Sequence, residues 1–214
     1  RRDKPLIKWS NAILANDELI LIERITSGFV SISDIGFVFP GIVTGSNKFF
    51  IINNNKKEEM NCSEYVLPII EKSNYIQNMI LYNKNDFNNL IIRNKPVWLL
   101  NLQGVEENEL SPKMVEYLSE GEDRELVKRY KCSIRKRWFE VPNIKKGDIL
   151  FFRRYNRLPK LVVNTANVYS TDVSYNIKVF SGFDPLSVVF CFYNSITITM
   201  CEYNGRFYGG GVCE

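Results

Sequence analysis

Histidine is absent from all 214 residues of the sequence. Histidine is the base of Ser-His-Asp triads and Cys-His dyads and a ligand in HExxH zinc sites, so these sites are excluded within this chain. The chain also lacks any Cys-x-x-Cys pair, which zinc sites commonly use. We therefore expect no bound metal and interpret the cysteines as buried free thiols: Cys62, Cys132, Cys191, Cys201 and Cys213.

Long apolar runs are also missing. No run approaches the roughly 18 residues that span a bilayer, and the longest, residues 186–191, has the length of a buried strand. The first residues do not form the pattern of a signal peptide. We expect a soluble, cytoplasmic protein without a membrane partner. The start at Arg1 and the stop just after the glycine run 209–211 lead us to expect further sequence on one or both sides.

The glycine-rich loops that bind nucleotides are not found. Such a loop lies between a strand and a helix, whereas the glycine run 209–211 opens no helix. The stretch around Gly45 lacks the upstream glycine of a phosphate-binding loop. Asp148 and Asp172 stand alone, as turn residues commonly do. We therefore expect neither catalytic residues nor a bound cofactor in this chain.

Short apolar runs separated by turn residues indicate a strand-rich fold. Ser111 and Pro112 predict the start of an amphipathic helix within residues 106–122, which continues after a break at Gly121 through residues 126–130. Residues 44–47 predict a hairpin or loop. We expect an α+β fold with twisted mixed or antiparallel sheets, a few helices and two lobes. The predicted strands are 37–42, 48–52, 65–70, 79–82, 97–100, 148–152, 161–163, 175–180 and 196–200.

Charge is distributed unevenly along the chain. Residues 101–122 contain six acidic residues and one lysine, whereas residues 123–160 contain thirteen basic and four acidic residues, an excess of nine positive charges. Dense basic clusters lie at 135–137 and 153–157, next to aromatic residues. Such a stretch can neutralise phosphates, and arginine can grip a phosphate or a guanine edge with two hydrogen bonds. The charge alone leaves open a solvated basic face that pairs with the acidic segment.

Two stretches in the first half of the chain carry patterns of one enzyme family. Residues 39–51 read FPGIVTGSNKFFI, similar to G-I-x-T-G-x-N-x-x-F. Residues 65–73 read YVLPIIEKS, similar to L-x-P-x-[IL]-[RK]-x-x-D, with Ser73 and Asn74 where an arginine and an aspartate are common.

Two further stretches lie in the second half. Residues 130–142 read YKCSIRKRWFEVP, similar to R-x-x-W-[WYF]-x-[VI]-P, and residues 194–212 are similar to N-S-x-L followed by G-R-x-Y-G-G-G-[VL]. With all four in order, the chain resembles, over residues 19–214, the target recognition domain of site-specific DNA adenine-N6 methyltransferases of restriction–modification systems.

The resemblance implies that this chain binds double-stranded DNA while an upstream domain of the same protein transfers the methyl group. That domain binds S-adenosylmethionine and holds the flipped adenine; its Asn/Asp-Pro-Pro-Tyr/Phe element and glycine loop are not found here. The cofactor is thus expected only for the parent protein. Residues 1–18 would be the linker and residues 19–214 the recognition domain, with lobes 19–105 and 124–214 joined by the helical segment 106–123.

DNA contacts are expected from three short segments. If residues 134–139 were strand-like, Arg135 and Arg137 would share one face and Lys136 would point the other way. We expect Trp138 and Phe139 to belong to the core. The predicted DNA-binding residues are Thr44, Asn47, Lys48, Arg135, Lys136, Arg137, Arg153, Arg154 and Arg157, and Asn164, Thr165 and Asn167 are fainter candidates.

Three alternative functions remain open on the sequence alone. The chain could be half of a type I specificity subunit, which uses a similar domain without fused catalysis. It could belong to a bifunctional type II restriction and modification enzyme with a nuclease further upstream. It could also be a protein–protein interaction module whose acidic and basic faces dock to each other.

Overall fold

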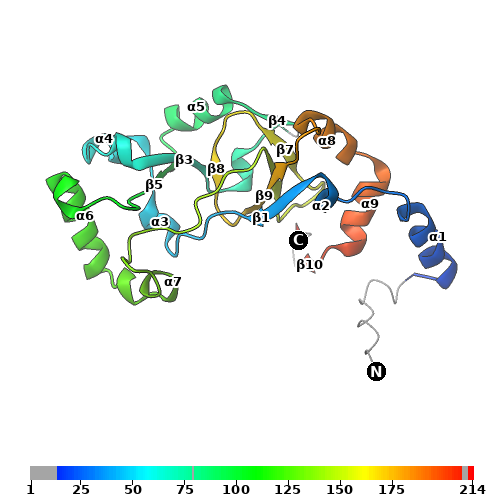
Figure 1. Cartoon of the computed structure of the whole chain (residues 1–214), viewed down its shortest axis with the longest axis horizontal. Coiled ribbons are helices and arrows are strands. Elements are labelled where there is room, and N and C mark those ends of the chain that lie inside the picture. The colour runs from blue at the N-terminus through cyan, green and yellow to red at the C-terminus, as the bar shows by residue number, and fades with distance from the viewer. Residues whose placement is uncertain (1–13, 79, 209–211) are drawn as a thin grey trace.

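The computed structural model describes residues 14–78, 80–208 and 212–214. The described part is elongated, with a smaller sheet toward one end and a larger sheet toward the other (Figure 1). Most of the predicted linker 1–18, Met79 of one predicted strand and the glycine run 209–211 lie outside the described residues. No helix in these ranges combines the length and hydropathy of a membrane-spanning helix.

The larger sheet carries a helix layer on each face. One face, which includes Ile149 and Ile177, packs under α8 (Pro185–Phe192), and the other face, which includes Leu150, packs on α5 (Lys84–Ile92). Its strands, in spatial order, are β1 (Gly36–Pro40), β9 (Ser174–Val179), β6 (Ile149–Phe152), β7 (Leu161–Asn164) and β4 (Leu81–Tyr82). All neighbouring pairs are antiparallel except β7 and β4, which are parallel.

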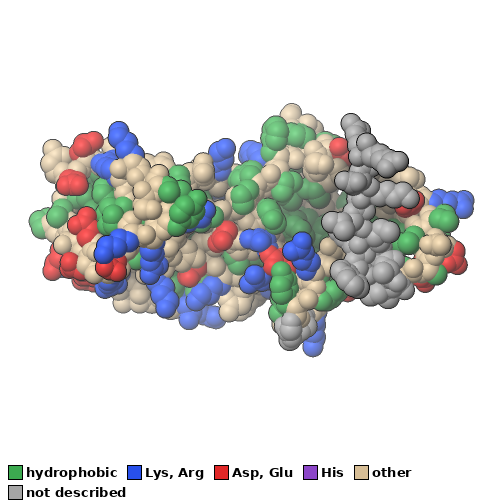
Figure 2. Space-filling model, turned by 90° about the horizontal axis from the view of Figure 1, so that it is seen from below, with side chains coloured by type: hydrophobic (Ala, Val, Ile, Leu, Met, Phe, Trp, Pro, Cys, Tyr) green, Lys and Arg blue, Asp and Glu red, His purple; other side chains and the backbone are tan. Residues whose placement is uncertain are grey.

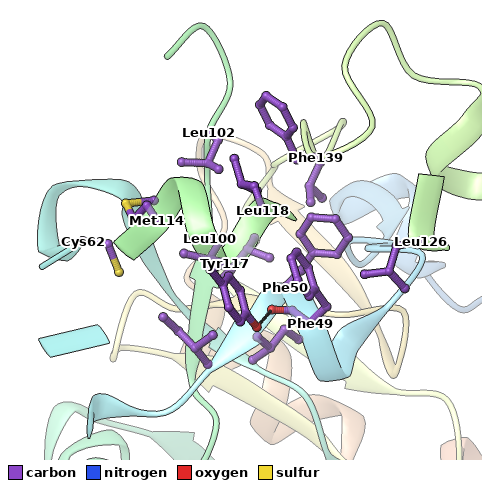
Figure 3. Close-up of a cluster of buried hydrophobic side chains, with 14 of the residues drawn as sticks. Phe49, Phe50, Cys62, Leu100, Leu102, Met114, Tyr117, Leu118, Leu126 and Phe139 are labelled. Carbon is purple, nitrogen blue, oxygen red and sulfur yellow. Dashed lines mark hydrogen bonds between the residues drawn. The ribbon is translucent and has the colours of Figure 1, made fainter. Parts of the chain in front are cut away.

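The smaller sheet packs against the amphipathic helix α6 (Pro112–Asp123), and an aromatic cluster fills the space between them (Figure 3). In that cluster Phe49 stacks on Tyr117, whose hydroxyl donates a hydrogen bond of 2.8 Å to the Phe49 carbonyl. The strands, in spatial order, are β2 (Ile51–Ile52), β5 (Trp98–Leu100), β3 (Val66–Ile70) and β8 (Tyr169–Ser170). A separate antiparallel pair consists of β10 (Phe207–Tyr208) and β11 (Val212–Cys213).

Further helical elements lie between the strands. They are the α-helices α1 (Asn16–Thr26), α2 (Ile32–Ile35), α3 (Asn47–Phe50), α4 (Asn54–Glu59), α7 (Tyr130–Ser133) and α9 (Ser195–Asn204), and the 3₁₀ turns η2 (Ser63–Tyr65), η3 (Ser73–Tyr75), η4 (Glu107–Glu109) and η5 (Leu126–Lys128). The α+β fold with mixed and antiparallel sheets is thereby confirmed. Each sheet takes strands from both expected lobe ranges, 19–105 and 124–214. The domain boundaries themselves stay a prediction.

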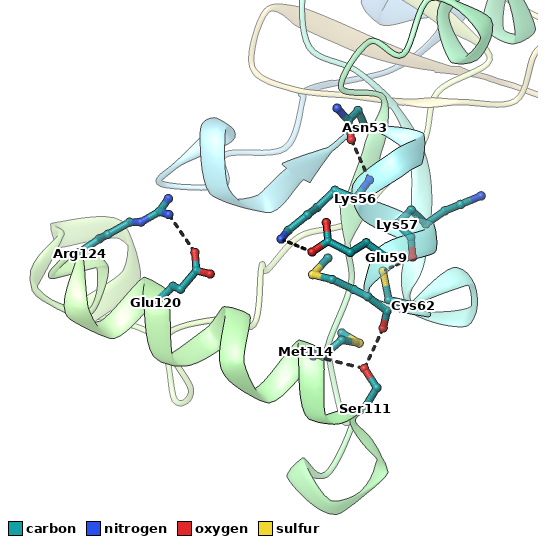
Figure 4. A network of polar contacts seen from close by, with 10 residues as sticks. Asn53, Lys56, Lys57, Glu59, Cys62, Ser111, Met114, Glu120 and Arg124 are labelled. Atoms are coloured by element: carbon teal, nitrogen blue, oxygen red, sulfur yellow. Dashed lines mark hydrogen bonds and ion pairs between the residues drawn. The ribbon is translucent and has the colours of Figure 1, made fainter.

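The predicted start of α6 is confirmed, but the break at Gly121 is wrong. Ser111 caps the helix by accepting from the Met114 N–H at 3.2 Å, and its hydroxyl donates to the Met60 carbonyl (Figure 4). The helix continues through Gly121 because this residue lies directly against aromatic rings, and a Cβ there would come within 2.3 Å of Trp138. It ends before Glu125, which has a left-handed φ of 57°.

Two apolar stretches in the last quarter are helices, although the first has the length of a strand and the second was predicted as one. Residues 186–191 belong to α8, where the Asp184 side chain accepts from the Ser187 N–H and Pro185 occupies the first turn. Residues 196–200 belong to α9, which the Asn194 side chain caps at the Thr197 N–H. The apolar alternation was misleading here because helix caps and packing on the sheet override β propensity.

Near the candidate site, two stretches differ from expectation, residues 48–52 and 134–139, and a third, residues 44–47, takes one of the two expected forms. Residues 48–52 are the end of α3 followed by β2, because both Phe49 and Phe50 are buried and the Ser46 carbonyl accepts from both of their N–H groups. Residues 44–47 form a loop and no hairpin, since β1 pairs with the distant β9. Residues 134–139 form a turn, so the strand-like run is wrong.

Gly41 lies where the chain passes from the larger sheet to the smaller one. Its N–H donates to the Ser174 carbonyl at 3.0 Å, and the next N–H, of Ile42, donates to the Ser170 carbonyl at 2.8 Å. A Cβ on Gly41 would lie 1.9 Å from the Thr171 carbonyl oxygen, closer than any side chain allows. Only glycine therefore lets the two backbone segments cross at this distance.

We expect Gly41→Ala to lower the free energy of unfolding by at least about 3 kcal/mol, since overpacking against backbone costs about 1–3 kcal/mol even where neighbours can yield. Gly28→Ala is the matched control, because nothing lies within 4 Å of a Cβ there. Urea unfolding of both variants measures the difference. Equal stability of the two would contradict the close crossing at Gly41.

Candidate nucleic-acid interface

The loop of residues 43–47 follows the crossing and holds itself by short polar contacts. The Thr44 hydroxyl donates to Asn47 Oδ1 at 2.5 Å and accepts from the Ser46 N–H at 3.1 Å. Thr44 is fully buried, and Gly45 adopts a left-handed φ of 81°. The polar chemistry that singled out Thr44 and Asn47 in the sequence thus shapes the loop, and Lys48 beyond it is exposed.

Arg135 fixes this loop to the turn that follows α7. Its Nη2 donates to the carbonyls of Thr44 at 2.7 Å and Val43 at 3.3 Å, and its Nη1 donates to the Trp138 carbonyl at 3.1 Å. The guanidinium also lies over the Phe50 ring, 5.5 Å from its centre. Burial lowers the pKa of Arg135, yet arginine remains charged at neutral pH. Three backbone acceptors occupy the planar fork of this side chain.

Arg137 fixes the same turn on its other side. It forms an ion pair with Glu140 at 2.5 Å and donates to the Val105 carbonyl at 2.7 Å. The hydrogen bond from Arg137 lowers the pKa of Glu140, so this carboxylate is ionised and paired at neutral pH. Arg135 and Arg137 are both half-buried, whereas Lys136 between them is exposed. The two arginines therefore differ from Lys136 as expected, although the segment is a turn and no strand.

Two grooves border the loop of residues 43–47. The first, which we call the loop groove, has a volume of about 610 Å³ and is lined by residues 43–49, Glu71, Arg124, Leu126, Arg129 and Asp172. The second, which we call the α7 groove, has a volume of about 780 Å³ and is lined by Gln103 and by residues from 39–43 and 131–145. The crossing segment therefore forms a ridge between two hollows.

Exposed cations without a carboxylate partner among the described residues border both grooves. Lys48 and Arg129 line the loop groove, and Lys131, Lys136 and Lys145 line the α7 groove. Lysine and arginine side chains gather over the face that Figure 2 shows, from the end with α7 toward the middle of the molecule. By contrast, Arg124 and Lys128 are paired with acidic neighbours on their own helical turns (Figure 4 shows Arg124).

The second predicted arginine cluster lies beside β11. Arg153 donates to Glu214 at 2.6 Å and lies over the Tyr175 ring, and Arg154 reaches the same carboxylate at 3.4 Å. Arg153 also donates to the Asp172 carbonyl at 3.4 Å, which connects this cluster to a wall of the loop groove. Arg157 is exposed and forms no ion pair with a carboxylate in the part of the chain that the structure describes.

The contacts of the other residues considered in the sequence are structural. Trp138 and Phe139 are buried in the aromatic cluster, as predicted. Asn164 is buried, and its amide donates to the carbonyls of Gly147 and Val168. Thr165 donates to the Tyr82 carbonyl, next to β4 and away from both grooves. These contacts support the turn after β7.

The cysteines agree only in part with the expectation of buried thiols. All five are free; Cys62, Cys132 and Cys213 are buried, but Cys191 is exposed and Cys201 is half-buried. Burial raises the pKa of Cys62 to about 11, so this thiol is protonated and unreactive at neutral pH. Within the described ranges, no cluster of three acidic or cysteine ligands could hold a metal ion.

Sequence reasoning did not single out Arg129, Lys131 and Lys145. All three lie in the basic stretch 123–160. Density of charge favoured the clusters at 135–137 and 153–157, where several arginines are instead occupied by backbone carbonyls or carboxylates. The three residues share exposure beside a groove and the lack of a described carboxylate partner, which are tertiary properties that no local sequence signal marks.

Arg135→Lys should lower the free energy of unfolding by about 1–3 kcal/mol, because an ammonium cannot replace the fork that satisfies three carbonyls. Lys136→Ala, at the exposed neighbouring position, should stay within about 0.5 kcal/mol of the parent. Urea denaturation gives both values. A destabilisation of the same size in the two variants would mean that Arg135 does not hold the loop.

Comparison with known proteins adds to this geometry. Residues 6–214 match the family model described as type II methyltransferase M.Eco57I, C-terminal domain. The chain is also 30% identical to the type II methyltransferase M.AccI of Acinetobacter calcoaceticus, over 97% of this chain and 38% of that protein. The chain therefore spans well under half the length of this curated relative.

Proposed function

Because this chain belongs to the family of type II methyltransferase C-terminal domains represented by M.Eco57I, we propose that it binds double-stranded DNA sequence-specifically as a target recognition domain. Methyl transfer from S-adenosylmethionine to adenine N6 belongs to an upstream domain of the parent enzyme, which acts in the cytoplasm. The observation that carries DNA binding is the α7 groove, with three exposed lysines that form no ion pair with a described carboxylate.

The charge balance of the two grooves favours phosphate binding in the α7 groove. Its one acidic wall residue, Glu140, is already paired with Arg137, whereas the loop groove contains Glu71 and Asp172. Unpaired lysines release counterions when they meet phosphates, and this release supplies most of the non-specific affinity for DNA. The lysine ammonium binds phosphate as a compact point charge and needs no fixed geometry.

The predicted site residues then have two kinds of role. Lys48 and Lys136, together with Lys131 and Lys145, contact phosphates. Thr44, Asn47, Arg135 and Arg137 keep the ridge and the turn in place, so that the cations face the duplex at a fixed spacing. Arg153, Arg154 and Arg157 form a second strip beside the loop groove, where Arg157 is the residue free for DNA.

Adenine as the methylated base is supported by the four matching stretches between residues 39 and 212 and by the division of labour that base flipping requires. An enzyme that extrudes a base must hold the surrounding duplex while the base is out of the stack. A domain without catalytic residues can supply this grip. The family match favours a methyltransferase over a type I specificity subunit.

Replacing Lys131, Lys136 and Lys145 by alanine should weaken binding to every duplex sequence and flatten the salt dependence. Each lost phosphate contact makes the slope of log K against log salt shallower by about 0.9. The slope of the triple variant, measured between about 50 and 200 mM salt, should therefore be shallower than the parent slope by up to about 2.7. Fluorescence anisotropy with a labelled duplex measures this slope.

The matched control replaces Lys84, Lys95 and Lys113 by alanine and so removes the same charge. These three lysines are exposed and lie on or beside α5 and α6. We expect this control to keep the parent slope. If both triple variants lose the same slope, the effect reflects net charge alone and the α7 groove is not the phosphate site.

The base assignment is tested on the full-length parent enzyme. Plasmid DNA from cells that express it should contain N6-methyladenine after digestion to nucleosides and mass spectrometry. A parent variant with the alanine triple should give less N6-methyladenine at equal protein level. Methylcytosine in place of N6-methyladenine would disprove adenine specificity and leave DNA binding intact.

A further inference from the structure

Helix α1 exposes an apolar surface that the described residues do not cover. The helix has no buried residue, although Leu19, Ile20, Leu21 and Ile22 follow one another in it. Successive helical residues are about 100° apart, so four consecutive apolar residues point to all sides. The exposed apolar side chains stand beside charges on an amphipathic helix, because the helix also carries the charged residues Asp17, Glu18, Glu23 and Arg24.

The exposure of these side chains divides the helix into two sides. Leu19 and Ile22 are half-buried, whereas Ile20, Leu21 and Ile25 are 64%, 55% and 41% exposed. The three exposed residues lie on one side of the helix, where the charged residues Asp17 and Arg24 stand between them. Further along the chain, Phe29 and Val30 are exposed as well. We call these five residues the α1 surface.

Propensity alone cannot keep α1 helical. Its 11 residues are fewer than the roughly 12–15 that an isolated helix needs to be marginally stable in water. Its caps are local: the Glu18 carboxylate accepts from the Ala15 N–H at 2.8 Å, and the Ser27 N–H donates to the Glu23 carbonyl. Tertiary packing must supply the remaining stability, and the described part of the domain provides it only on the side of Leu19 and Ile22.

We propose that the α1 surface docks against the N-terminal part of the parent methyltransferase. The family model is that of a C-terminal domain, so the rest of such a protein precedes α1, and 62% of the length of M.AccI lies outside the matched region, as the complement of the 38% covered. α1 is the first described helix after that junction. Docking through it sets the orientation of the α7 groove relative to the active site.

This inference rests on the catalytic partner named in the proposed function, and it is independent of DNA binding by the α7 groove. Hydrogen–deuterium exchange without DNA compares this chain with the full-length methyltransferase. The amides of α1 should exchange at least about tenfold more slowly in the full-length protein, because docking removes local opening. The amides of α5, which packs on the face of the larger sheet that α8 does not cover, serve as the internal reference.

Variants of the full-length protein assign the protection to the α1 surface. Leu21→Gln with Ile25→Gln keeps good helix formers but removes the apolar contact, and it should restore fast exchange in α1. Ile92→Gln is the matched control, because Ile92 is 80% exposed at the end of α5. This control should leave exchange in α1 unchanged.

Three results would overturn the docking proposal. The first is equal exchange of α1 in the isolated chain and in the full-length protein. The second is protection that the glutamine pair does not reduce. The third is protection in the isolated chain that rises with protein concentration, which assigns the α1 surface to a second copy. If α1 is protected but the alanine triple in the α7 groove leaves the salt slope unchanged, docking stands and the assignment of the phosphate site falls.

Discussion

The candidate interface depends on the contact between one guanidinium and the backbone of a distant loop. Arg135 donates to the carbonyls of Val43 and Thr44 and to that of Trp138, and thereby joins segments 91 residues apart in sequence. Such an attachment needs a planar fork with several donors, which lysine does not have. The close crossing at Gly41 fixes where the loop begins. Together they place one ridge between two grooves, and the cations of both grooves take their positions from it.

A basic stretch can therefore contain residues with different tasks. Within 123–160, the half-buried arginines hold backbone or carboxylate groups, and the exposed lysines of the α7 groove have no described carboxylate partner. This division has a physical basis, because arginine keeps its charge when buried and binds several acceptors at once, while lysine is strongly hydrated and remains at the surface. A fixed scaffold that carries free cations suits a partner with evenly spaced negative charges.

Much of the fold could be predicted from local pattern. Strands with alternating or continuous apolar residues, such as β3, β6 and β9, follow from rules that act over a few residues. The same holds for the start of α6, which Ser111 caps. The helices α8 and α9 could not be distinguished from strands, since their β-branched residues favour strands and only caps and packing decide. The candidate interface lies in the basic stretch that the sequence singled out, and DNA contact there stays a prediction. Its division into holding and free cations depends on contacts with Val43, Val105 and Glu214, which lie far away in sequence.

The central claim is that the face with the α7 groove lies against the DNA duplex. Photo-crosslinking tests it most directly, with a duplex that carries 5-iododeoxyuridine at successive positions and with peptide mapping by mass spectrometry. The account predicts crosslinks in residues 39–48 and 129–145, and none in α5. Crosslinks confined to α5 or to α1, with the ridge and α7 unlabelled, would contradict it.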